Sequence, residues 1–186
     1  MKNLDKGSPL RFIIMFLTLF IGLYYFNIFF FSVTSPGRHY NAFLDHHLNY
    51  IRLLRHLLLA ASAQIINWFG FTSIINDIEL LVVGHGTIQV VYTCLGLGVM
   101  SFFTAFVIAY PKKIKSKLLF LIPGLLCIQM LNILRFVLLA LFWNKKSGLI
   151  LDHHTIFNIT IYIIIFISLY FWIKHDGNQS LSSAKN

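Results

Sequence analysis

Four long apolar runs constrain the fold of this chain more than any other feature. They cover residues 10–31, 94–110, 118–143 and 155–172. A helix needs about 20 residues to cross a hydrocarbon core of about 30 Å, and each run approaches or exceeds that length. The mean hydropathy of +0.76 also lies outside the usual range for soluble domains. The sequence therefore predicts an all-α integral membrane bundle with four or five transmembrane helices.

Two further segments lie between the first and second runs. Residues 50–70 are helical in composition but carry Arg52, Arg55 and His56, so this segment either lies in the membrane interface or crosses the bilayer. Two short apolar runs then flank Gly84-His85-Gly86, which predicts a small β-hairpin within residues 78–93. We expect a single transmembrane domain over residues 1–173, followed by a polar tail over residues 174–186.

The basic residues indicate how the helices cross the membrane. The net charge is +9, but Lys and Arg stand in short clusters beside the apolar runs, as topology signals do, so we expect no nucleic-acid partner. Four spans with a cytoplasmic N-terminus, or five spans with an outer one, each place nine basic residues inside and five outside. Both arrangements predict a multi-pass protein of the cell membrane with the hairpin on the outer face.

Three reactive side chains, Cys94, Arg135 and His154, lie close to the ends of three different apolar runs. Each is 16 to 18 residues from the cytoplasmic end of its helix, which corresponds to roughly 24 to 27 Å at about 1.5 Å per residue. We therefore expect the three side chains to share one level near the outer interface.

These residue types suit thiol chemistry. A free thiol is mostly protonated at neutral pH, so a nucleophilic Cys94 needs a nearby positive charge and a base, which Arg135 and His154 would supply. Asn132, three residues before Arg135, would orient its guanidinium. Cysteine in an apolar run is nevertheless more often a small buried apolar residue.

Each partner of Cys94 also has a simpler interpretation. Arginine at a helix end commonly extends toward the interface, and a histidine at a helix start is commonly a cap or a solvated group. His153 and His154 are adjacent, so only one of them is expected to face the bundle interior.

Cys127 has no polar neighbour nearby in sequence and is interpreted as structural. The remaining histidines show no regular ligand spacing, so no metal or other cofactor is expected.

Three segments, in this order, resemble the exosortase/archaeosortase family. They are the run from Ile78 to Leu97 that contains Thr93-Cys94-Leu95-Gly96, the segment Asn132-Ile133-Leu134-Arg135, and the segment His154-Thr155-Ile156-Phe157-Asn158. Members are integral membrane sorting enzymes regarded as cysteine transpeptidases. In this chain Leu95-Gly96 follows the cysteine where the family commonly has Ser-Gly, so the resemblance is to a short, divergent member.

The resemblance implies a function and a site. Cys94 matches the family's nucleophile, Arg135 its essential arginine and His154 its histidine, with His153 as a competing match. The expected substrates are secreted proteins with a C-terminal signal, in which a recognition motif precedes a hydrophobic helix and a basic tail. The alternative is a non-enzymatic transporter subunit or assembly factor, in which Arg135 binds an anionic ligand or lipid.

Overall fold

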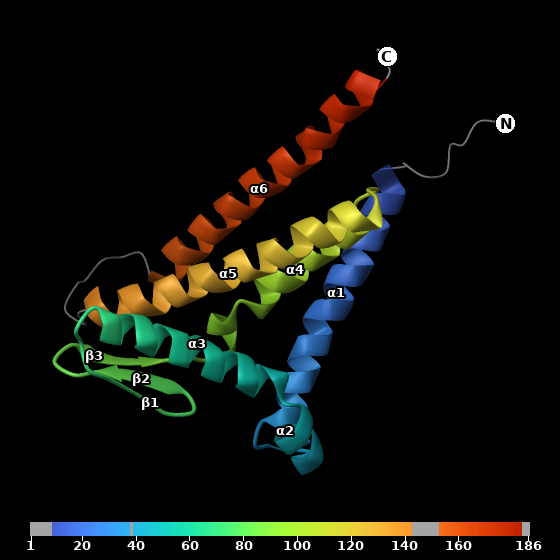
Figure 1. The fold of residues 1–186 in the computed structure, drawn as a ribbon. Coiled ribbons are helices and arrows are strands. Elements are labelled where there is room, and N and C mark those ends of the chain that lie inside the picture. The colour runs from blue at the N-terminus through green and yellow to red at the C-terminus, as the bar shows by residue number, and fades with distance from the viewer. Residues whose placement is uncertain (1–8, 38, 143–152, 184–186) are drawn as a thin grey trace. The chain divides into compact units, whose positions relative to one another are not determined.

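The computed structural model describes residues 9–37, 39–142 and 153–183 (Figure 1). The chain divides into two compact units, Met1–Ser147 and Gly148–Asn186, which are described separately. The elements of the first unit are α1 (Pro9–Thr34), α2 (Ala42–Leu48), α3 (Tyr50–Trp68), β1 (Ser73–Ile75), β2 (Glu79–Val82), β3 (Gly86–Gln89), the 3-10 turn η1 (Tyr92–Leu95), α4 (Leu97–Ala109) and α5 (Ile114–Phe142). The second unit contains α6 (His153–Ser183).

Three of the described helices are long and apolar enough to cross a membrane. They are α1, α5 and the part of α6 from Phe157 to Lys174. The expected count of four or five spans is not confirmed, because α4 has only 13 residues and α3 does not meet the same criteria. At about 1.5 Å per residue, α4 is about 20 Å long. The chain is thus a largely helical membrane protein with a small sheet.

The bounds of α4 follow from the residues at its ends. Residues 94–96 were expected to be its first turn, but Cys94 lies in η1 and Gly96 has a left-handed backbone (φ 72°). At the other end Tyr110 is extended, as expected for a residue that precedes proline, and Pro111 ends the helix. The apolar run 94–110 is therefore a turn and a short helix.

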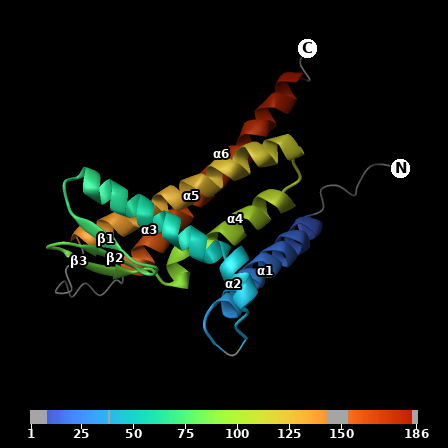
Figure 2. The ribbon, with the colours of Figure 1, turned by 60° about the horizontal axis from the view of Figure 1, so that its bottom comes forward.

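A row of aromatic contacts joins α1 to α4, which lie side by side (Figures 1 and 2). Phe16 and Phe20 of α1 meet Phe102 of α4 edge to face, with ring centroids 5.5 and 6.0 Å apart. Phe12 meets Phe106 in the same way at 5.4 Å. Such edge-to-face pairs add to the stabilisation from burial itself, so they help to hold α1 against α4.

The helices α4 and α5 pack closely at Gly124. The Phe103 ring, which is almost fully buried, lies where a Cβ of Gly124 would stand. Pro123 precedes this glycine inside the helix, yet α5 is continuous from Ile114 to Phe142. The absence of a side chain at Gly124 therefore allows α4 to lie against α5 and carry η1 toward the C-terminal half of that helix.

Helix α3 is amphipathic and packs on α5 and the sheet. Ile51, Leu58 and Ile66 are buried, whereas Leu53 and Leu57 are exposed. The buried residues are seven and eight positions apart, a spacing that places them on one face of the helix. The segment predicted over residues 50–70 is therefore a helix that covers the core of the first unit with one side.

The sheet has three antiparallel strands in the order β1-β2-β3. The predicted hairpin corresponds to β2 and β3, in which Leu80 pairs with Ile88. The strand β1 was not predicted, because its three residues are too few to produce an alternating pattern, and it pairs with β2 through Ile74 and Leu81. Leu80 and Val82 point into the core, and β3 leads through Val90 to η1.

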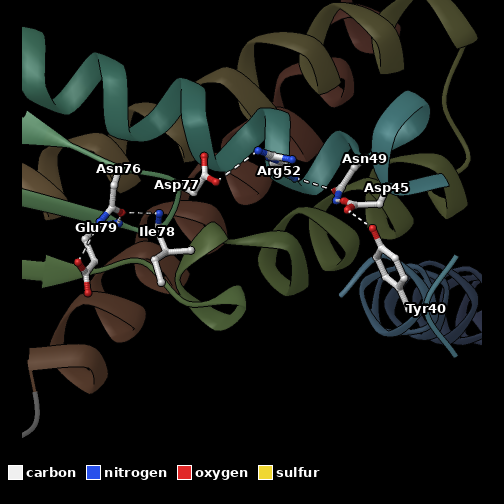
Figure 3. A network of polar contacts seen from close by, with 8 residues as sticks. All are labelled: Tyr40, Asp45, Asn49, Arg52, Asn76, Asp77, Ile78 and Glu79. Atoms are coloured by element: carbon white, nitrogen blue, oxygen red, sulfur yellow. Dashed lines mark hydrogen bonds and ion pairs between the residues drawn. The ribbon is translucent and has the colours of Figure 1, made fainter. Parts of the chain in front are cut away.

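A polar network connects α2, α3 and the turn before β2 (Figure 3). The Tyr40 hydroxyl donates to Asp45 at 2.8 Å, and Asn49 donates to the same carboxylate at 2.6 Å. Hydrogen bonds from Asn49 and Tyr40 hold the pKa of Asp45 below its usual value. Arg52 then pairs with Asp77 at 3.3 Å. These contacts orient the start of α3 relative to the sheet.

The helix α6 extends from His153 to Ser183. It therefore continues into residues 174–183, for which the sequence predicts a polar tail. The prediction of one domain over residues 1–173 stays a prediction.

Candidate functional site

Cys94 lies in η1, between the end of the sheet and the start of α4. Its backbone N–H donates to the carbonyl of Val91 at 2.9 Å, which closes the turn. The cysteine side chain is 8% exposed, and Leu95 beside it is fully buried. The thiol therefore belongs to the core of the first unit and is held by a tight turn with little freedom to move.

Gly96 makes this turn possible. Its φ of 72° is a conformation that residues with a side chain adopt only at a cost, and an added Cβ would overlap the side-chain amide of Asn132. The backbone after Cys94 can therefore pass directly beneath α5. This explains structurally why a glycine follows Cys94-Leu95.

We expect Gly96→Ala to lower the thermal unfolding midpoint and to displace Cys94. The left-handed backbone costs about 1–2 kcal/mol for alanine, and Asn132 must also move and lose hydrogen bonds worth about 1 kcal/mol each. Gly84→Ala is the matched control, because Gly84 also has a positive φ (84°) but nothing within 4 Å of its Cβ position. Equal losses in the two variants would show that the contact with Asn132 is unimportant.

Arg135 comes to the cysteine from α5. Its side chain is 2% exposed, and Nη2 lies 3.9 Å from the Sγ of Cys94, toward which it donates. The two residues are 41 positions apart in the sequence. A buried guanidinium beside a thiol places a permanent positive charge where a thiolate would form, in a region of low dielectric. The structure therefore brings these two residues together, and their shared level near the outer membrane interface stays a prediction.

Two amide side chains of α5 bind the turn that carries Cys94. Asn132 and Gln129 both donate to the carbonyl of Leu95, at 3.4 and 3.3 Å, and Asn132 also donates to Gln129 Oε1 at 3.1 Å. Asn132 thus donates to the turn and to Gln129, whereas the sequence predicts that it orients the guanidinium of Arg135. Asn132 is 1% exposed, so its amide is oriented by these bonds.

Gln129 is a further residue of this site, and the sequence analysis did not identify it as a candidate. Its Nε2 also lies 2.6 Å from the Sδ of Met100, so it connects α5 to α4 as well as to the turn. The signal was present, because Gln129, Asn132 and Arg135 recur every three residues in an otherwise apolar run. Residues at this spacing share one side of a helix, and here that side faces the cysteine.

Comparison with known proteins identifies the family of this chain. The family model described as Transmembrane exosortase matches residues 5–171. The chain belongs to the transmembrane exosortase family. No curated protein and no solved structure matches it. The match covers every segment on which the sequence resemblance rests, so the expectation of exosortase membership is confirmed.

In this exosortase the two candidate histidines of the site lie in the second unit. His153 and His154 belong to the first turn of α6. Their side chains lie outside the part of the chain whose side chains the structure describes. The role of His154, and the competing claim of His153, therefore stay predictions.

Tyr92 is the titratable neighbour of Cys94 along the exosortase chain. Its ring packs against that of Phe31 at an interplanar angle of 32°, with centroids 4.5 Å apart. Burial raises the pKa of the Tyr92 phenol to about 12. The phenol therefore stays protonated at neutral pH and is unsuited to accept the proton of Cys94.

The second cysteine of this exosortase differs from the first. Cys127 is exposed on α5 and lies eight residues before Arg135, about 12 Å along the helix axis. It thus provides a natural control for experiments on Cys94. Among the described residues, no three His, Cys, Asp or Glu side chains gather into a potential metal site.

Proposed function

We propose that this exosortase is a membrane-embedded cysteine transpeptidase or protease that cleaves a C-terminal sorting signal of secreted proteins at the outer membrane interface. One observation carries the proposal: the 3.9 Å contact between Arg135 Nη2 and Cys94 Sγ, both of them buried. Membership of the exosortase family supports the same reaction class.

The two described residues have complementary roles in such a reaction. The guanidinium of Arg135 stabilises the thiolate of Cys94 before attack. It then donates to the carbonyl oxygen of the substrate as that oxygen becomes negative. Because the charge is buried, its effect on both anions is larger than it would be in water.

The proposed reaction has two steps. His154 takes the thiol proton, and the sulfur of Cys94 attacks the scissile carbonyl carbon, forming a tetrahedral oxyanion beside Arg135. This intermediate breaks its C–N bond, and the leaving amine takes the proton from His154, which leaves a thioester on Cys94. Water or an acceptor amine then attacks the thioester and releases the thiol.

The position of Cys94 suits a substrate anchored in the membrane. The cysteine lies just before the apolar helix α4, next to the C-terminal half of the long apolar helix α5. A substrate whose hydrophobic helix lies beside these helices would present the preceding peptide at the level of the thiol. We therefore infer a secreted partner with a hydrophobic C-terminal helix and a basic tail, and lipid as the surrounding medium.

Covalent trapping tests the proposal. The full chain is expressed with a secreted protein that ends in a hydrophobic helix and a basic tail, and adducts are isolated at mildly acidic pH. We expect an adduct that hydroxylamine releases, that Cys127→Ser retains and that Cys94→Ala lacks. An adduct that persists in Cys94→Ala would contradict the assignment of the nucleophile.

A further inference from the structure

We propose that the end of the bundle opposite Cys94 contains a binding site for the headgroup of an anionic phospholipid. The starts of α1 and α5 and the end of α4 enclose a cavity of about 630 Å³ there. Figure 1 shows these three helix ends together, beside the short connection between α4 and α5. Cys94 precedes α4 and the cavity follows it, so about 20 Å of helix separates the two sites.

The cavity is lined by four cationic side chains from three parts of the chain. Arg11 comes from the first turn of α1, and the others come from the segment between α4 and α5 and from the first turn of α5. These others are Lys112, Lys113 and Lys117. Two segments that are far apart in the sequence thus bring positive charge to one opening, where that charge attracts an anion.

The cations are arranged around the opening with different partners. The Nζ of Lys117 donates to the carbonyl of Ile108 in the last turn of α4, where helix carbonyls carry partial negative charge. Lys112 lies 6.0 Å from the ring centroid of Tyr110. Lys113 is exposed at the rim. Lys117 therefore offsets the negative end of α4, and Lys113 is placed to meet an anion that enters from outside.

Negative side chains lie elsewhere in the described part of the chain. The carboxylates whose side chains the structure describes are Asp45 in α2, Asp77 before β2, and Glu79 in β2. Arg11 lies at the start of α1, and α2 follows the end of α1. The 26 residues of α1 extend about 39 Å, so Asp45 is far from the cavity. The field at the cavity is therefore positive among the described residues, and distant carboxylates are screened from it.

The apolar part of the lining favours a lipid over a free phosphate ion. Phe12 and Met15 of α1 and Ile108 of α4 form the wall that continues into the apolar helices. Free phosphate would use only the cations, whereas a phospholipid would also place the beginning of its acyl chains against this wall. Charge at the rim and apolar side chains toward the bilayer match the two ends of such a molecule.

Native mass spectrometry of the full chain in mild detergent tests this site. The chain is titrated with phosphatidylglycerol or phosphatidylcholine of the same acyl length. We expect tighter binding of phosphatidylglycerol, and Lys113→Gln should weaken that binding about fivefold. Excess inorganic phosphate should not displace the lipid.

Lys115→Gln is the matched control, because Lys115 belongs to the same basic segment and is exposed but does not line the cavity. We expect it to bind phosphatidylglycerol as the original chain does. Equal weakening in both variants would overturn the site and indicate only diffuse attraction. Equal binding of the two lipids, or displacement by inorganic phosphate, would overturn the lipid assignment. Matching unfolding midpoints exclude a folding defect as the cause.

Discussion

Replacing Cys94 by alanine is expected to abolish processing of a secreted substrate while the chain stays in the membrane at its normal level. Loss of a covalent nucleophile commonly removes at least about three orders of magnitude in rate. The change deletes a single sulfur atom from a residue that is 8% exposed, so the effect on folding is small compared with the loss of chemistry. The measurement is the ratio of unprocessed to processed substrate on a gel, with the chain quantified in the same membranes.

Cys127→Ala is the control for this experiment. Cys127 is exposed on α5, and the substitution should leave processing unchanged. Normal processing by Cys94→Ala would contradict the enzyme proposal. It would favour the non-enzymatic alternative, in which the buried charge of Arg135 serves to bind an anionic ligand.

Substitution of Arg135 should have the second largest effect. Arg135→Gln removes the positive charge beside the sulfur and is expected to lower the processing rate by about 10²–10³. Arg135→Lys should retain part of the rate, because it keeps a charge but loses the planar fork of donors that can reach the sulfur and the oxyanion together. Processing rates of the two variants, each normalised to protein level, provide the comparison.

A second readout separates this chemical role from a structural one. Arg135 is 2% exposed, so its loss also disturbs packing. At a fixed neutral pH, a small alkylating reagent should modify Cys94 more slowly in Arg135→Gln than in Arg135→Lys, since only the latter retains a charge that stabilises the thiolate. Equal alkylation rates in the two variants, with equal unfolding midpoints, would contradict the role of the charge. Arg52→Gln is the control, because Arg52 is exposed and pairs with Asp77.

Local patterns in the sequence were sufficient for part of this structure. Apolar length predicts the three long helices, and two apolar runs around Gly84-His85-Gly86 predict the β2–β3 hairpin. Helix rise predicts one depth for Cys94 and Arg135, and the structure brings the two side chains together. These properties depend on composition and on spacing along one segment.

Other features depend on contacts between segments. The strand β1 exists because β2 offers an edge to pair with, and its three residues carry no pattern of their own. Asn132 was expected to bind Arg135, three residues away. Its amide instead donates to the backbone carbonyl of Leu95, which is 37 residues away in the sequence. Periodicity along α5 indicates which side chains share a face of the helix. It does not indicate which other segment of the chain contacts that face.

The sequence by itself determined that this chain is a helical membrane protein of the exosortase family. It also indicated Cys94 and Arg135 as candidate site residues. Only the tertiary structure decided that Cys94 lies in a turn closed by Gly96, within 3.9 Å of Arg135, and that Gln129 and Asn132 hold that turn. The physical reason is the range of the interactions. Hydropathy and helix rise are properties of a single segment. The contact of Gly96 with Asn132 and the amide hydrogen bonds to Leu95 form only when α5 packs against the turn.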